Sequence, residues 1–201
     1  MERDAVRSAQ TCAAAVLRHL SAESDTLASV AEDITALYSL GTVLVGAASK
    51  DVRQKSAATI ANLCADRKDA RCAFCASDDA LLGLHRLMMS KDAQCYESAL
   101  AALANMSLDP DNAGVILSNI HIDRVLALIA PGSSPKAQLR AIGLLRNLAF
   151  CREARARLAA SSGLLTTLGA VVNEGPRQAR QRARTALAVL EGRRPPRRRG
   201  G

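Results

Sequence analysis

The chain has 201 residues, of which 49% are hydrophobic and only 2% aromatic, and tryptophan is absent. Apolar surface therefore suffices for a continuous core, but Ala and Leu must supply most of the packing. The net charge of +8 lies at one end, because residues 177–201 hold nine arginines against one acid while residues 1–176 are balanced. No run of about 20 apolar residues and no signal peptide is present, so we expect no membrane span and a soluble protein of the cytoplasm, the nucleus or both.

One helical motif recurs along the chain at a fixed period. Each copy has a large aliphatic residue two positions before an anchor residue, Leu or Met one position after it, and a small residue six positions before it. Successive anchors are 42 or 43 residues apart, at His19, Asn62, Asn105, Asn147 and Val189. A helical period of about 40–47 residues is typical of armadillo and HEAT solenoids, in which each unit buries its apolar face by stacking on its neighbours.

The elements between these long helices follow a consistent order. The chain opens on a copy of the long helix, residues 1–20, which we expect to cap the stack, and residues 25–48 read as helix until Gly41 and Gly46. Later intervals each hold two shorter helices, which we place at residues 67–76 and 80–89, 112–118 and 120–130, and 153–160 and 164–172. Three helices per unit favour an armadillo-type repeat over a HEAT-like one.

The chain resembles the armadillo-repeat family from about Ala5 to Leu190. The resemblance rests on the A-x-x-x-[LI]-x-N-[LM] pattern of the long helix and on the segment SSGLLTTL at residues 161–168. It implies an all-α, right-handed α-solenoid over residues 1–191. Residues 192–201 form a basic tail without apolar residues, which we expect to be disordered.

The resemblance also implies a concave groove in which one Asn per repeat hydrogen-bonds the backbone of an extended peptide. By position these residues are Asn62, Asn105 and Asn147. A side-chain amide both donates and accepts, so it can bond a peptide unit without reading its side chain. The alternative is that these asparagines only cap or bridge neighbouring repeats.

The sequence departs from the nuclear-import receptors of that family. Those receptors place Trp four residues before the Asn, to hold Lys side chains by cation–π contact. Here the equivalent residues are Ala58, Ala101 and Gly143, so a receptor for basic import signals does not fit.

Seven positions before the anchors the residues are mostly basic. They are Lys55, Ser98, Arg140 and Arg182. This column resembles the basic grooves of catenin-like armadillo proteins and suggests an acidic peptide as ligand by charge complementarity. A solvated helix face is the alternative.

No set of residues looks catalytic or metal-binding. Cys72 and Cys75 form the one C-x-x-C pair, and a structural zinc site would need two further ligands at matching spacing. The three histidines are far apart in the sequence, and the cysteines read as reduced thiols. We therefore expect no enzyme, no cofactor, no metal and no small-molecule substrate.

The basic tail has three interpretations: a nuclear localisation signal, a sequence-independent contact with nucleic acid or acidic surfaces, or a solubilising end. Its arginines are Arg193, Arg194, Arg197, Arg198 and Arg199. Taken together, the sequence predicts a non-enzymatic protein-interaction module or adaptor that binds an extended, acidic peptide. The alternative is a nucleic-acid-associated scaffold anchored by the arginines of residues 177–199.

Overall fold

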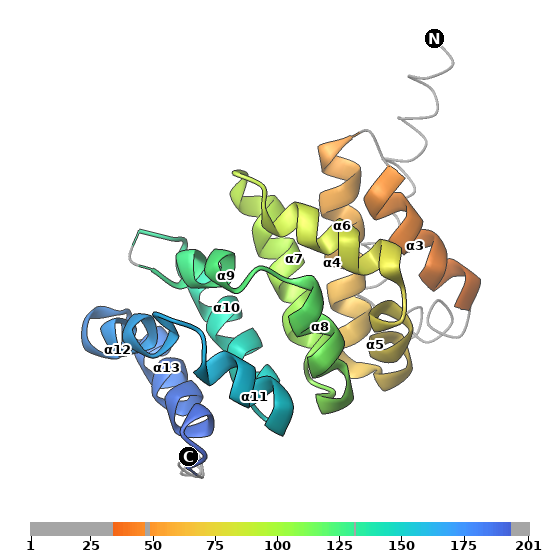
Figure 1. The fold of residues 1–201 in the computed structure, drawn as a ribbon. Coiled ribbons are helices and arrows are strands. Elements are labelled where there is room, and N and C mark those ends of the chain that lie inside the picture. The colour runs from red at the N-terminus through yellow and green to blue at the C-terminus, as the bar shows by residue number, and fades with distance from the viewer. Residues whose placement is uncertain (1–33, 47–48, 131, 194–201) are drawn as a thin grey trace.

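The structure is a computed structural model that describes residues 34–46, 49–130 and 132–193. Within these ranges every regular element is a helix and no strand occurs. Units adjacent in sequence are neighbours in space, so the helices form a stack that follows the chain (Figure 1). The predicted all-α solenoid is thus confirmed for this part of the chain. The expected capping helix at residues 1–20 lies outside the described residues.

Three units of the stack repeat one layout, in which a short helix and a middle helix precede a long helix. A middle and a long helix stand before them, and the short helix of the second full unit begins with a 3-10 turn. The armadillo-type unit of three helices is therefore confirmed. The elements are α3 (Ile34–Gly46), α4 (Lys50–Asp66), α5 (Lys68–Cys75), α6 (Asp78–Met88), α7 (Ala93–Met106), η1 (Pro110–Asn112), α8 (Ala113–Asn119), α9 (Ile122–Ile129), α10 (Pro135–Leu148), α11 (Arg152–Ala159), α12 (Leu164–Glu174) and α13 (Arg177–Leu190).

Side-chain caps begin several of these helices. Ser77, Asp92 and Ser134 each accept hydrogen bonds from backbone N–H groups two or three residues further on. These bonds satisfy donors that the first turn of a helix leaves unpaired. Pro135 follows Ser134 in the first turn of α10, where its missing N–H is not needed. The turn signals of the sequence therefore coincide with real helix starts.

The repeated positions of the long helices form the core. Of the aliphatic residues two positions before the anchors, Ile60, Leu103 and Leu145 are fully buried, and Leu187 in the last helix is half-buried. The small residues six positions before the anchors are also fully buried, and they are Ser56, Ala99, Ala141 and Ala183. Because small side chains let helices approach closely, α4, α7, α10 and α13 pack side by side in that order.

Two glycines set the contact between the middle helices α3 and α6. A Cβ atom added to Gly83 would lie 2.5 Å from the Cβ of Leu44, and one added to Gly41 would lie 2.9 Å from Ser77 Oγ. Helix α3 runs through Gly41 and ends at Gly46, so the interruption expected at Gly41 does not occur. Here glycine permits close packing, which outweighs its weak helix propensity.

Polar side chains also join successive units on the middle helices. The guanidinium of Arg124 in α9 donates to the carbonyl oxygens of Met88 at 3.0 Å and Ser90 at 2.8 Å. Met88 is the last residue of α6, where a helix leaves its last acceptors without backbone partners, and Ser90 lies in the turn that follows. Arg124 also lies over the ring of Tyr96, 5.6 Å from its centroid. The bond from Arg124 to Met88 therefore joins two units and also caps the C-terminus of α6.

The last helix ends in a Schellman motif. Gly192 has a φ of 73°, its N–H donates to the carbonyl of Val189 at 3.0 Å, and the N–H of Arg193 donates to Ala188 at 2.7 Å. This pair of bonds closes a helix on a left-handed glycine. The first two residues of the expected tail thus belong to the end of the solenoid. Residues 194–201 lie outside the described part of the chain.

No single helix of the described ranges is long and apolar enough to cross a membrane. The segments Pro110–Asn119 and Ile122–Ile129 reach that length and composition only as a pair, which is bent by 98°. Their apolar residues Ile116, Val125 and Ile129 are fully buried in the solenoid core.

Candidate functional site

A shallow concavity crosses the four long helices. It has a volume of about 380 Å³ and is lined by residues of α4, α7, α10 and α13, together with Leu108 after the end of α7. We call this concavity the groove. It contains all three predicted asparagines and the two predicted arginines Arg140 and Arg182. The solenoid therefore brings together residues that are spread over 120 positions of the sequence.

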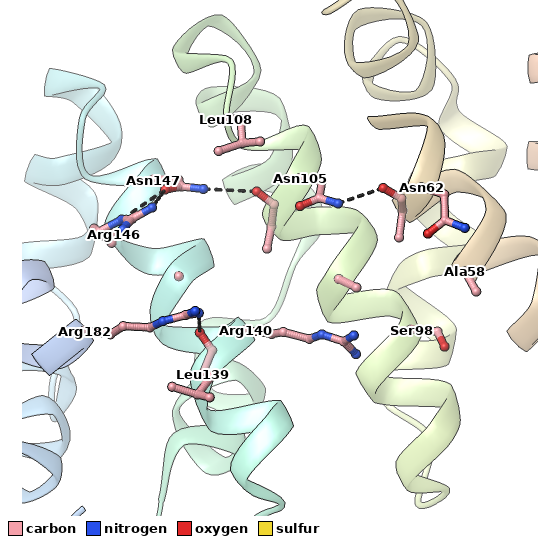
Figure 2. A pocket seen from close by; sticks show the side chains of 14 residues that line it. Ala58, Asn62, Ser98, Asn105, Leu108, Leu139, Arg140, Arg146, Asn147 and Arg182 are labelled. Carbon is pink, nitrogen blue, oxygen red and sulfur yellow. Dashed lines mark hydrogen bonds between the residues drawn. The ribbon is translucent and has the colours of Figure 1, made fainter. Parts of the chain in front are cut away.

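The asparagines lie in one row along the groove, as Figure 2 shows. Asn105 Nδ2 donates to the carbonyl of Ala61 at 2.7 Å, and Asn147 Nδ2 donates to the carbonyl of Ala104 at 3.1 Å. Each acceptor belongs to the preceding long helix. Both donors therefore bridge adjacent repeats, the role that the sequence left as the alternative, and binding of a peptide by the row stays a prediction.

The two bridging asparagines differ in what they leave free. Asn147 is buried, and its Oδ1 accepts from Arg146 Nε at 3.2 Å and Nη2 at 2.8 Å, while its Nδ2 also donates to Ser107 Oγ. Asn105 is half-buried, and its Oδ1 accepts no hydrogen bond from the described residues. Asn105 thus keeps an acceptor for a ligand, whereas the amide of Asn147 is committed to the fold.

The arginine column repeats one contact. Arg140 Nη1 donates to the carbonyl of Glu97 at 2.7 Å, and Arg182 Nη1 donates to the carbonyl of Leu139 at 3.1 Å. Each bond spans 43 residues, one repeat. Burial lowers the pKa of Arg140, while the charge of Glu97 raises it; arginine still stays cationic at neutral pH because its ordinary pKa is far higher. Both guanidinium groups are therefore fixed in place and keep further N–H donors.

The other two members of this column behave differently. Ser98 lines the groove and accepts a hydrogen bond from Gln54 Nε2 at 2.8 Å. Lys55 is not among the lining residues, and its ammonium pairs with the carboxylate of Asp51 one turn earlier at 2.6 Å. A contact between Lys55 and a ligand stays a prediction.

The floor of the groove is made of small residues. Ala58, Ala101 and Gly143, which occupy the position of the family's tryptophans, all line it. A Cβ added to Gly143 would have Arg182 Nη1 as its nearest neighbour, at 4.0 Å. No aromatic slot for a lysine side chain is present among the lining residues.

The groove is positively charged. Its lining includes Arg140, Arg146 and Arg182 but no aspartate or glutamate. A one-signed concavity concentrates counter-ions and favours ligands of the opposite charge. The described side chains can therefore attract carboxylates and hydrogen-bond a peptide backbone, but they offer no nucleophile paired with a base.

Five lining residues escaped the sequence analysis, namely Ala61, Ala104, Leu108, Leu139 and Arg146, and the two with large exposed or charged side chains are Leu108 and Arg146. Arg146 precedes Asn147, and the equivalent residues are Arg18, Ala61, Ala104 and Ala188, so the repeat gave only one matching arginine for it. Leu108 follows Asn105 by three positions and is 47% exposed. A comparison of that position across the repeats would have found it, because Phe150 occupies the same place after Asn147.

The cysteine pair of α5 lies outside the groove. Cys72 Sγ is 3.8 Å from a carboxylate oxygen of Asp109, and Cys75 Sγ is 3.8 Å from the carbonyl oxygen of Asn112. Burial raises the pKa of the Cys75 thiol to about 11, so it is a weak nucleophile at neutral pH. No group of three or more metal-ligating side chains occurs in the described ranges.

Of the tail arginines, only Arg193 is described. It is exposed and forms an ion pair with Glu191. The remaining predicted residues, Arg194, Arg197, Arg198 and Arg199, lie outside the described residues.

Solved structures match the fold closely. A designed armadillo repeat protein in complex with the peptide (KR)4 gives a TM-score of 0.78 at 19% identity, over 89% of this chain and 74% of that one. Computationally designed armadillo repeat proteins for modular peptide recognition give 0.76 at 22% identity, over 87% and 74%. An engineered protein gives 0.82 at 19% identity, over 90% of this chain and 44% of its own. No protein-family model and no curated protein matches the sequence. The chain therefore has the armadillo-repeat fold.

Proposed function

We propose that this armadillo-repeat solenoid is a protein-interaction module, without enzymatic activity, that holds an extended acidic peptide in the groove. The observation that carries the proposal is the charge of the groove, which presents three arginines and no acid. An elongated surface across four long helices fits an extended chain better than a compact small molecule, since small-molecule sites are usually enclosed and mostly apolar.

The contacts available in the groove indicate how a peptide would be held. Arg140 and Arg182 each retain guanidinium donors for carboxylates or carbonyl oxygens of the ligand. Asn105 Oδ1 can accept a peptide N–H, because the described residues give it no other donor. Charge-assisted bonds are the stronger of these contacts. The arginines would therefore supply most of the affinity, with Asn105 fixing the register of the backbone.

The fold comparison supports a peptide ligand, and the groove chemistry supports its charge. One matching designed protein is solved with (KR)4, a basic peptide. The groove of this chain favours a ligand of the opposite charge, because its cationic residues repel a basic peptide and attract an acidic one.

A binding experiment with matched charge variants tests the proposal. The probe is a fluorescein-labelled octapeptide of alternating Glu and Ser, measured by fluorescence polarisation, with an alternating Lys–Ser octapeptide as comparison. The double variant Arg140→Gln, Arg182→Gln should bind the acidic probe at least about a hundredfold more weakly, because a hydrogen bond to a charged group contributes about 1.5–3 kcal/mol and two arginines are lost.

The control carries the same loss of charge away from the groove. Arg86→Gln with Arg152→Gln removes two exposed arginines, from α6 and α11, that do not line the groove. This variant should bind within about threefold of the wild type, since distant exposed charges are screened by salt. Equal losses in the two double variants, or equal binding of the acidic and basic probes, contradict the proposal.

A second candidate, nucleic-acid binding, is favoured by the outer face of the last helix. Arg177, Arg180 and Arg184 of α13 are exposed, and the arginines of the tail follow them in the sequence. The variant Arg177→Gln, Arg180→Gln, Arg184→Gln should then lose affinity for a labelled DNA duplex, with a shallower dependence on salt, because each lost phosphate contact lowers the slope by about 0.9. The acidic probe should bind this variant almost as well as the wild type.

A further inference from the structure

Exposed apolar residues recur at one repeat position beside the groove. Leu108 and Phe150 each lie three residues after an anchor asparagine, and they are 47% and 53% exposed. The N–H of each donates to the carbonyl of its anchor, Asn105 or Asn147, at 3.1 Å. The same turn therefore ends α7 and α10 and presents a large apolar side chain in both.

The apolar position and the arginine column lie on opposite sides of the asparagine row. Figure 2 shows Leu108 on one side of Asn105 and Asn147, with Arg140 and Arg182 on the other. Phe150 belongs to the next unit, and a solenoid maps equal repeat positions onto equal places of its surface. Leu108 lines the groove on the side away from the arginines. Phe150 is not among the lining residues but occupies the equivalent place one unit further on, and we call the two residues the apolar border.

The apolar border is confined to two units. The equivalent residues at the ends of the described stack are Ala65, within α4, and Gly192, in the Schellman turn after α13. Single exposed apolar side chains are common on protein surfaces and need no explanation. Two large ones follow α7 and α10, the same two helices whose carbonyls bind Arg140 and Arg182. Together they give the groove an apolar side and a charged side.

An extended peptide matches such a surface through its own geometry. Successive side chains of a strand point to opposite sides, and each residue advances the chain by about 3.3 Å. Packed helices lie about 8–10 Å apart, so each unit of the stack meets two or three residues of the ligand. A strand lying along the asparagine row therefore sends alternate side chains toward the arginines and toward the apolar border.

We propose that the groove selects extended segments in which acidic residues alternate with apolar ones. The acidic side chains face Arg140 and Arg182, and the apolar ones pack against Leu108 and Phe150. The inference rests on the proposed function and adds a second determinant of specificity, so that an acidic sequence without apolar residues is a weaker ligand than an alternating one.

Two probes of equal charge test this inference. A labelled octapeptide of alternating Glu and Leu should bind about tenfold more tightly than the alternating Glu–Ser octapeptide. A tenfold gain corresponds to about 60 Å² of newly buried apolar surface at roughly 25 cal/mol per Å², an area that two half-exposed side chains can supply. The gain should vanish in the variant Leu108→Ser, Phe150→Ser, so that this variant binds the two acidic probes with equal affinity.

A matched control separates the apolar border from general hydrophobicity. Leu82→Ser with Leu165→Ser removes two leucines of similar exposure, 42% and 44%, from the middle helices α6 and α12. This variant should keep the full preference for Glu–Leu. Equal affinity for the two acidic probes, or a preference that survives loss of the apolar border, overturns the inference and leaves the acidic groove standing. An alternating Lys–Ser probe that binds as tightly as Glu–Ser refutes the acidic groove and this inference with it.

Discussion

Truncation of Asn147 to Ala should destabilise the solenoid more than the same truncation of Asn105. Asn147 is buried and donates to both the carbonyl of Ala104 and Ser107 Oγ. At about 0.5–1.5 kcal/mol per neutral hydrogen bond, these two bonds contribute about 1–3 kcal/mol to the free energy of unfolding. The guanidinium of Arg146 also loses its acceptor Oδ1, but that side chain is only half-buried and can turn to water.

Asn105 makes one such bond, to the carbonyl of Ala61. That carbonyl lies inside α4, where the backbone of the helix also offers it a donor. The truncation Asn105→Ala should therefore cost only about 0.5–1.5 kcal/mol, roughly half of the Asn147 effect. Position in the repeat is identical, so the difference comes entirely from burial and partners.

Urea unfolding followed by circular dichroism measures both effects on the same protein. Asn119→Ala is the matched control, because Asn119 is exposed and its amide bonds only Val115 in its own helix. It should change stability by less than about 0.5 kcal/mol. Equal losses for Asn105→Ala and Asn147→Ala, or no loss for either, refute the reasoning that the asparagine row clamps neighbouring repeats unequally.

Four further predictions follow from the core, the packing, the titration and the tail. Leu103→Ala should cost about 2–5 kcal/mol in the same urea assay, since the side chain is fully buried, and a loss under about 1 kcal/mol contradicts the stacked core. Gly83→Ala should cost about 1–3 kcal/mol, because its Cβ would come 2.5 Å from a side chain of α3, whereas Gly114→Ala, with nothing within 4 Å, should be neutral or stabilising. Burial and the neighbouring imidazole of His121 lower the pKa of His85. The neutral His85 therefore contributes stability above about pH 6.5, and this contribution is lost as the pH falls through the lower pKa of the folded state. His85→Gln should flatten the dependence of the unfolding midpoint on pH in this range. Deletion of residues 194–201 removes four arginines and should shift a tagged protein from the nucleus toward the cytoplasm if they form an import signal, while an unchanged distribution rules that role out.

The place of a side chain on the solenoid surface could be predicted from the sequence, because it depends on the position of that residue within its repeat. Arg140 and Arg182 occupy one position, lie in one groove and bond equivalent carbonyls of the preceding long helix, 43 residues back. Lys55 shares the position, but the equivalent carbonyl, about 43 residues back, lies outside the described residues. Its ammonium pairs with the carboxylate of Asp51 one turn earlier on its own helix.

Hydrogen-bond partners were the part that repeat position could not supply. The sequence left open whether the asparagines bind a ligand or bridge repeats. In the structure the Nδ2 groups of Asn105 and Asn147 each donate to a carbonyl of the preceding long helix, and of these two amides only the oxygen of Asn105 accepts no hydrogen bond from the described residues. The counterparts of Arg146 in the described repeats are alanines, Ala61, Ala104 and Ala188, so its bond to Asn147 is not repeated along the described stack. The helix through Gly41 could not be predicted from its sequence position either, because Gly41 packs closely against the start of α6, a contact between elements far apart in the chain.

The most direct test of the acidic peptide groove is chemical-shift mapping of the isotope-labelled protein during titration with the alternating Glu–Ser octapeptide. The proposal predicts that the largest changes fall on the side-chain N–H signals of Arg140 and Arg182 and on the backbone amides of Ala101 and Gly143 in the floor of the groove. Changes that instead fall on exposed signals of α11 and α12, with these four groups unmoved, would contradict it.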